Sequence, residues 1–137
     1  MEDYIVFKEI ERVENAKKIR YLSREEEIFK QRIEQLLEKN ENIKKAECIL
    51  FEDCLKVQCE IKQVVKKGYL NAHNFFPSYL SIFRFPSFEC LEWFKKSVVF
   101  LILRRDMYDA NSVYEIVFYI DKEYYDLFFE VLKLTYK

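Results

Sequence analysis

One stretch of the sequence, Ile61–Phe88, holds no acidic residue in a chain where 34% of the residues are charged. It also holds the only glycine of the chain, its only histidine and both of its prolines. Proline lacks a backbone donor and restricts the residue before it, so a long helix is excluded here. Seven aromatic residues fall within the stretch, although connecting loops ordinarily lie on the surface. Either these rings fold back onto the domain, or they are presented to a partner.

The whole chain has the length and the apolar content of one compact domain. Half of its 137 residues are hydrophobic, and a chain of this size buries roughly two thirds of its unfolded surface without needing disulfides or metals. The N-terminus carries acids where a secretory signal needs bases and an apolar run. The longest apolar run, Val98–Leu103, is too short to cross a bilayer. We therefore expect a cytoplasmic protein without membrane contact.

Hydrophobic periodicity predicts the elements of the first half of the chain. Residues 4–7 have strand composition, although the following apolar spacing would also suit a helix. Ser23 and Glu26 form a capping-box pattern that predicts a helix over residues 24–39, with a continuation to Lys45 left open. Strict alternation predicts a hairpin over residues 47–65, with its turn at Glu52 and Asp53.

The second half repeats the order of one helix and two strands. We predict a short helix from Ser87 or Phe88 to about Lys96, because acids lie near its start and lysines at its end. Two strands follow at residues 98–103 and 113–120, and Asp121 is placed to cap the last helix. The sequence therefore predicts a small single α+β domain, with helices packed on one face of a mainly antiparallel sheet.

Catalytic and metal-binding patterns are weak in this sequence. The four cysteines lack a CxxC pair, and one histidine is too few for a usual zinc site, so we interpret them as buried free thiols. A single glycine excludes the glycine-rich loops that bind nucleotide phosphates. His73 could serve acid–base chemistry and Asp106/Asp109 could bind a metal, but ordinary loop and turn roles are the simpler interpretations. We expect no metal and no cofactor.

The aromatic and basic residues between 66 and 96 carry our functional hypothesis. Rings and cations interleaved in this way anchor protein interfaces, and they also stack on single-stranded nucleic acid. We expect a non-enzymatic binding protein that docks on a larger protein or ribonucleoprotein assembly, for example as an inhibitor or a ribosome-associated regulatory factor, with RNA contact left open. The expected partner-binding residues are Lys66, Lys67, Tyr69, His73, Phe75, Phe76, Tyr79, Arg84, Phe85, Lys95 and Lys96.

Two alternatives stand beside this hypothesis. The first is a structural homodimer, formed through an exposed strand or through the last helix, whose Tyr124, Tyr125, Phe128 and Phe129 cover more than one helical face. The second is a small enzyme that uses carboxylates or His73. It predicts a concave pocket near these groups.

Overall fold

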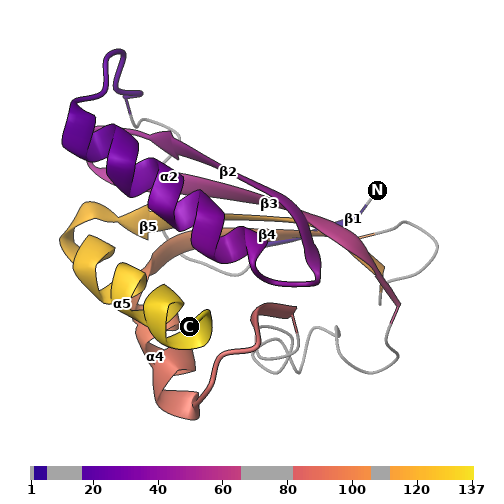
Figure 1. Ribbon diagram of the computed structural model, residues 1–137. Coiled ribbons are helices and arrows are strands. Elements are labelled where there is room, and N and C mark those ends of the chain that lie inside the picture. Colours follow the sequence, from indigo (N-terminus) through magenta and orange to yellow (C-terminus); the bar gives the residue numbers. More distant parts are fainter. Residues whose placement is uncertain (1, 6–16, 66–81, 106–111) are drawn as a thin grey trace.

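The computed structural model of the chain describes residues 2–5, 17–65, 82–105 and 112–137. Within these ranges, five antiparallel strands form one sheet in the order β1-β4-β5-β3-β2, and three α-helices accompany it (Figure 1). The elements are β1 (Glu2–Ile5), α2 (Arg24–Glu38), β2 (Ile43–Leu50), β3 (Cys54–Val65), α4 (Phe88–Ser97), β4 (Val98–Arg105), β5 (Ser112–Asp121), the 3-10 turn η2 (Lys122–Tyr124) and α5 (Tyr125–Thr135).

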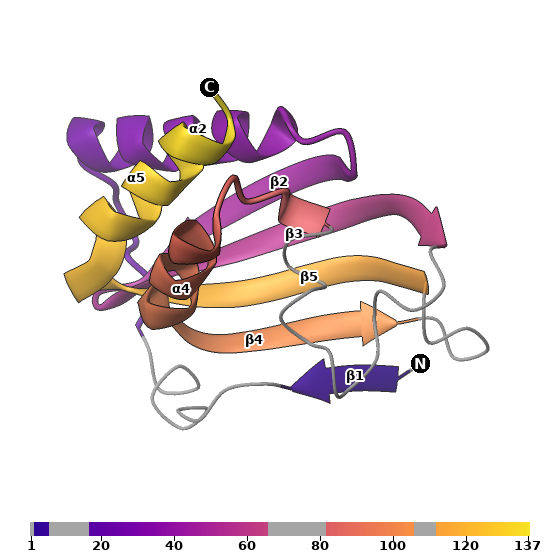
Figure 2. The ribbon, with the colours of Figure 1, turned by 90° about the horizontal axis from the view of Figure 1, so that it is seen from below.

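All three helices lie on one face of the sheet (Figure 2). Helix α2 runs along β2 and β3, while α5 and α4 cross the face over β5 and β4. The predicted α+β class, with an antiparallel sheet and helices packed against it, is confirmed. None of the described helices combines the length and the apolarity that crossing a membrane requires.

The first helix begins where the sequence pattern placed it. The Ser23 backbone donates to Oε1 of Glu26 at 2.8 Å, and the Glu26 backbone donates to Oγ of Ser23 at 3.1 Å. The predicted capping box is therefore confirmed, and Ile33 and Leu37 form the buried face of the helix. The continuation to Lys45 is wrong, because α2 ends at Glu38 and strand β2 begins at Ile43.

The hairpin β2–β3 shows the predicted alternation. Leu55, Val57, Cys59 and Ile61 are buried beneath the helices, while the residues between them point to the other face. Strand β2 starts four residues earlier than expected, at Ile43, and an irregularity in its register with β3 precedes the regular pairing. That irregularity disrupts the period-two pattern from which the strand start was predicted.

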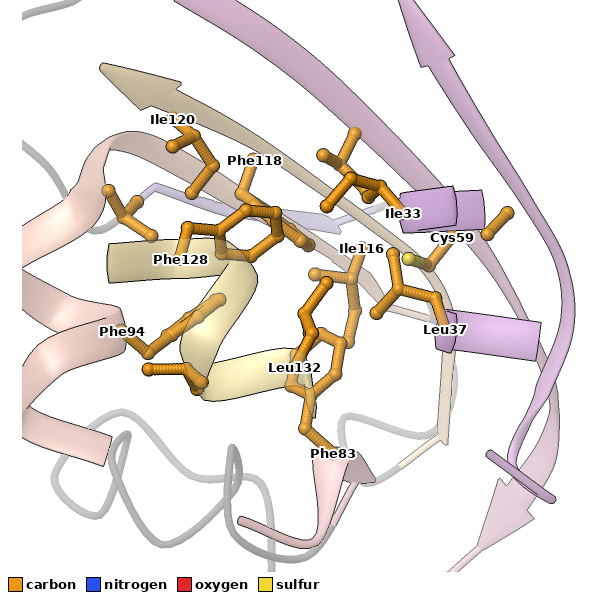
Figure 3. Packing of buried hydrophobic residues seen from close by; sticks show 14 of the residues in the cluster. Ile33, Leu37, Cys59, Phe83, Phe94, Ile116, Phe118, Ile120, Phe128 and Leu132 are labelled. Atoms are coloured by element: carbon orange, nitrogen blue, oxygen red, sulfur yellow. The ribbon is translucent and has the colours of Figure 1, made fainter. Parts of the chain in front are cut away.

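Phenylalanine rings meet in the core among aliphatic side chains such as Ile33, Leu37 and Leu132 (Figure 3). Phe94 of α4 meets Phe118 of β5 edge to face, with ring centres 5.2 Å apart, and Phe128 of α5 meets Phe118 at 5.9 Å. Phe83, which follows the undescribed residues 66–81, lies 5.5 Å from Phe94. Aromatic rings in such edge-to-face or tilted contacts stabilise the fold by more than their buried area alone provides. The four rings therefore join two helices, the sheet and the end of the acid-free stretch.

Strand β2 is an edge strand, and side chains of α2 cover part of its free edge. The Cys48 backbone donates to Oε2 of Glu34 at 2.8 Å, and the Ala46 backbone donates to Oε2 of Glu38 at 3.4 Å. The two glutamates lie one helical turn apart, which matches the two-residue spacing of outward donors on a strand. Two positions of the edge are thereby closed to a further strand.

Chain before α2 covers the next two positions of the same edge. The Ile19 backbone donates to the carbonyl of Leu50 at 3.0 Å, and the Glu52 backbone donates to the carbonyl of Lys17 at 2.9 Å. Between them, Lys18 and Phe51 form an isolated antiparallel bridge. Alternate positions from Ala46 to Glu52 therefore have partners along this edge.

Helix α5 packs on α2 through aromatic rings. The Phe29 ring lies 5.2 Å from that of Tyr125 and 6.2 Å from that of Phe129. The hydroxyl of Tyr125 is buried and has no hydrogen-bond partner among the described residues. Burial, followed by neighbouring negative groups, raises the pKa of Tyr125, so the hydroxyl stays protonated.

Replacing Tyr125 by Phe is therefore expected to stabilise the protein. The change removes a buried polar atom that gains no hydrogen bond here, and it should raise the free energy of unfolding by about 1 kcal/mol. Urea unfolding of the wild type and the Tyr125→Phe variant measures the difference. A loss of stability on this substitution would show that the hydroxyl has a partner after all.

Candidate docking surface

The predicted partner-binding residues divide into two groups. Seven of them, Lys66, Lys67, Tyr69, His73, Phe75, Phe76 and Tyr79, lie outside the described residues. The other four, Arg84, Phe85, Lys95 and Lys96, lie where the acid-free stretch ends and α4 follows. The described part of the candidate surface therefore lies at this end of the stretch.

A buried group of polar side chains fixes the end of the acid-free stretch. Asn40 donates from Nδ2 to the carbonyl of Ile82 at 2.6 Å and to the hydroxyl of Tyr136 at 2.8 Å. The Tyr136 hydroxyl in turn donates to the carbonyl of Phe83 at 2.8 Å. Oδ1 of Asn40 accepts from the backbone of Asn42 at 2.8 Å. We call Asn40, Asn42 and Tyr136 the anchor cluster.

The anchor cluster satisfies backbone groups that burial would otherwise leave unpaired. Asn40 is 4% exposed and Tyr136 is 9% exposed, and the two side chains lie 96 positions apart in sequence. Burial raises the pKa of Tyr136, so its hydroxyl remains a donor. The carbonyls of Ile82 and Phe83 are thus held by residues beyond α2 and at the end of α5. Sequence reasoning missed this cluster, because no local pattern links asparagine to a carbonyl so far along the chain.

Arg84 has an unusual backbone conformation directly after the anchored residues. Its φ is 60°, and among the described residues it is the one residue other than glycine that has a positive φ. The left-handed region costs a residue with a Cβ roughly 1–2 kcal/mol. The guanidinium of Arg84 pairs with the carboxylate of Glu41, and both side chains are more than half exposed. The backbone turn therefore directs the arginine side chain to the surface beside the anchor cluster.

Phe85 lies in the core. Its side chain is 7% exposed, and its ring centre lies 5.0 Å from that of Phe94 and 5.6 Å from that of Phe83. Its ring therefore contributes packing and has little surface to offer a partner. Local sequence could not separate this ring from an exposed one, because Pro86 ends the periodic pattern one residue later.

An exposed ring lies three positions further on. Phe88, the first residue of α4, is 68% exposed although Leu91 and Phe94 of the same helix are buried. The oxygen of Ser87 caps this helix by accepting from the backbone of Cys90 at 3.1 Å. The cap fixes the helix start and leaves Phe88 on its outer side. Phe88 is one of the seven rings of the acid-free stretch, but it is not among the predicted partner-binding residues.

The two lysines at the end of α4 have different surroundings. Nζ of Lys95 lies 3.2 Å from Oε1 of Glu92, one turn earlier on the helix. Nζ of Lys96 lies 5.8 Å from the centre of the Tyr124 ring. Both lysines also lie at the negative end of the helix dipole. These neighbours keep the two cations close to α4.

The residues weighed for catalysis are mostly outside the described part. His73, Asp106 and Asp109 are not described, so the pocket that the enzyme alternative predicts near them is not tested. Arg104 is described, and its Nη1 lies 3.2 Å from Oε1 of Glu115 on the neighbouring strand. The two residues are register partners, so this arginine forms a local cross-strand ion pair.

The four cysteines are free and buried, as predicted. Burial, the largest cause, raises the pKa of Cys48 and Cys59 well above the usual range, so these thiols remain protonated. Within the residues that are described, no group of three or more His, Cys, Asp or Glu side chains is placed to hold a metal ion. The described thiols are thus packing residues of the core.

Thiol labelling should follow from this burial. We expect a thiol reagent at pH 8 to modify the native protein at least about a hundredfold more slowly than the urea-unfolded chain, because reaction must await opening of the core. The absorbance of the chromophore that the reagent releases on reaction measures the rate of thiol modification. Fast labelling of one native cysteine would contradict its buried placement, and mass spectrometry would identify which one.

A comparison with protein-family models, with curated proteins and with solved structures found no match to this chain.

Proposed function

We propose that this protein is a non-enzymatic binding protein that docks on a larger protein or ribonucleoprotein assembly. Its docking surface is the acid-free stretch together with the start of α4, and Arg84 and Phe88 are its described contact residues. An inhibitor of an enzyme and a ribosome-associated regulatory factor are both proteins of this kind. The absence of acids from Ile61–Phe88 suits a partner surface that is acidic or lined by phosphate.

The backbone of Arg84 is the observation that carries this proposal. A left-handed arginine is retained only where the surrounding structure over-determines it, and such residues gather at functional sites. Here the anchor cluster holds the two preceding residues, and the side chain of Arg84 is 53% exposed. Planar guanidinium groups are frequent anchors of interfaces because they bind carboxylate and phosphate with two hydrogen bonds.

Phe88 adds an apolar anchor to the same surface. A ring that is 68% exposed at the first position of a capped helix extends from a fixed backbone and buries a large area on contact. Such a ring loses little conformational entropy when it binds. An arginine and an aromatic ring four residues apart therefore provide both polar and apolar contact.

The homodimer alternative has less support in the described part of the chain. The edge of β2 has partners at alternate positions, and the rings of Tyr125 and Phe129 pack against Phe29 of α2. Phe128 is fully buried. A stable dimer would thus need another surface than the β2 edge or these rings of α5.

Affinity capture from a lysate of the cells that make the protein tests the proposal. The bait is the full chain, compared with a Phe75→Ala/Phe76→Ala/Arg84→Ala variant. We expect the wild type to capture a defined protein or an RNA-rich assembly, identified by mass spectrometry and the ratio of absorbance at 260 and 280 nm, and the variant to lose most of it.

A matched control removes the same kinds of side chain elsewhere. Tyr21→Ala/Arg24→Ala/Ile28→Ala deletes two exposed apolar groups and one arginine near the start of α2. This variant should capture the partner as the wild type does. Equal capture by all three proteins would contradict the proposed surface. Sedimentation of the purified wild type as a stable dimer would favour the homodimer instead.

A further inference from the structure

A cleft of about 320 Å³ opens between the start of α2, the β2–β3 turn and the start of α5. It lies at the opposite end of α2 from the anchor cluster, so it is separate from the proposed docking surface. The rings of Phe29, Phe51 and Tyr125 line it, together with the aliphatic side chains of Ile19 and Leu50. A small organic molecule or one long side chain fits a space of this size.

The charges around the cleft are predominantly negative. Glu25, Glu26 and Glu52 line it, whereas Lys122 is the one basic residue in the lining. Glu26 is engaged in the capping box with Ser23. Among the described residues, the carboxylates of Glu25 and Glu52 make no hydrogen bond or ion pair, so both remain available to a ligand.

The surroundings of Tyr125 give a second sign of negative potential. Burial is the largest cause of its raised pKa, Cys54 is the next, and the carboxylates of Asp53, Asp121 and Glu26 follow. Lys122, whose charge also lowers the pKa of Glu26, opposes this potential only in part. A cation that enters the cleft therefore meets carboxylates at the rim and aromatic side chains in the walls.

We infer that this cleft binds an organic ammonium ion, an apolar body that ends in a protonated amine. The apolar body packs against Phe29, Phe51 and Tyr125, and the ammonium group pairs with the carboxylates of Glu25 and Glu52. A free aromatic amine and the lysine side chain of a peptide share this chemistry.

Titration of the isotope-labelled full chain by NMR spectroscopy tests the inference. The probes are 2-phenylethylamine, the neutral 2-phenylethanol of nearly the same shape, and methylammonium, which has the charge without the ring. We expect the amine to saturate shifts at Phe29, Leu50 and Tyr125 with a Kd of about 1 mM, which suits a ligand of this size. The alcohol should bind at least about tenfold more weakly, and methylammonium should give no saturable shift.

Two variants distinguish a specific role of the cleft carboxylates from a general effect of negative charge on the surface. Glu25→Gln/Glu52→Gln should weaken the amine at least about tenfold and leave the alcohol unchanged. Glu123→Gln removes an exposed acid beside Lys122 that does not line the cleft, and it should leave both affinities as they are. Both sets of positions are on the surface, so the fold should be retained, and thermal unfolding verifies this.

A lysine whose amino and carboxyl groups are both blocked as amides distinguishes the two sources of the ammonium group, a free amine and a peptide side chain. Tighter binding of the blocked lysine than of 2-phenylethylamine assigns the cleft to a peptide side chain, and the reverse order assigns it to a free amine. Equal affinity for amine and alcohol, wild-type amine binding by Glu25→Gln/Glu52→Gln, or no saturable shift at the cleft would each overturn the inference. None of these results bears on the docking surface at Arg84 and Phe88.

Discussion

Substitution of Asn40 by Ala is expected to lower the free energy of unfolding by about 3 kcal/mol, because it leaves several buried groups without their partner. The carbonyl of Ile82 loses its 2.6 Å donor, the hydroxyl of Tyr136 loses the donor at 2.8 Å, and the backbone of Asn42 loses its acceptor. Each of these groups stays buried in the remaining structure. Urea unfolding, followed by circular dichroism, measures the loss.

Two further variants make this prediction specific. Gln35→Ala removes an exposed amide from α2, and it should change stability by less than about 0.5 kcal/mol. Asn40→Asp keeps the acceptor for Asn42 but turns a carboxylate oxygen toward the carbonyl of Ile82, so it should be at least as damaging as Asn40→Ala. A wild-type stability for Asn40→Ala would contradict the role of the anchor cluster.

The double substitution Glu34→Ala/Glu38→Ala is expected to open the edge of β2. The variant loses the acceptors for the backbone donors of Cys48 and Ala46, at a cost of about 2 kcal/mol in the free energy of unfolding. The freed donors form a template for strand addition, so we also expect dimers or larger species that increase with concentration. Denaturant unfolding and sedimentation velocity measure the two effects.

The matched control for this edge is Glu34→Gln/Glu38→Gln. Both variants lose the ion pair between Lys30 and Glu34, whose charged atoms lie 3.5 Å apart, but the glutamine oxygens can still accept from the strand. The glutamine variant should therefore remain monomeric and lose less stability than the alanine variant. If the two variants behave alike, the hydrogen-bond acceptors of these side chains do not protect the edge.

The sequence predicted the elements whose signals are local. Helix α2 has a capping box and a clear apolar face, and β3 has strict alternation, so both were placed almost at their observed bounds. The continuation of α2 to Lys45 was wrong because the side chains of Asn40 and Asn42 both donate to the distant carbonyl of Ile82, and the chain turns away from the helix there. Periodicity alone does not contain those partners.

Local sequence patterns could not predict the order of the strands in the sheet. They also could not predict which residues of the docking surface are exposed. Strand β5 lies between β3 and β4, and β1 pairs with β4, which depends on contacts far apart in sequence. The same limit placed Phe85 in the predicted binding set, since nothing nearby shows that its ring packs on Phe94. The left-handed backbone of Arg84 also has no sequence signature, because such positions usually carry glycine.

The most direct test of the docking surface is amide hydrogen exchange of the full chain, free and bound to the partner that affinity capture identifies. We expect slower exchange on binding in the peptides that cover residues 61–96, and unchanged exchange along the β2 edge and at the cleft between α2 and α5. Protection confined to β2, or to the faces of α2 and α5, with unchanged exchange at Arg84 and Phe88, would contradict the proposed function.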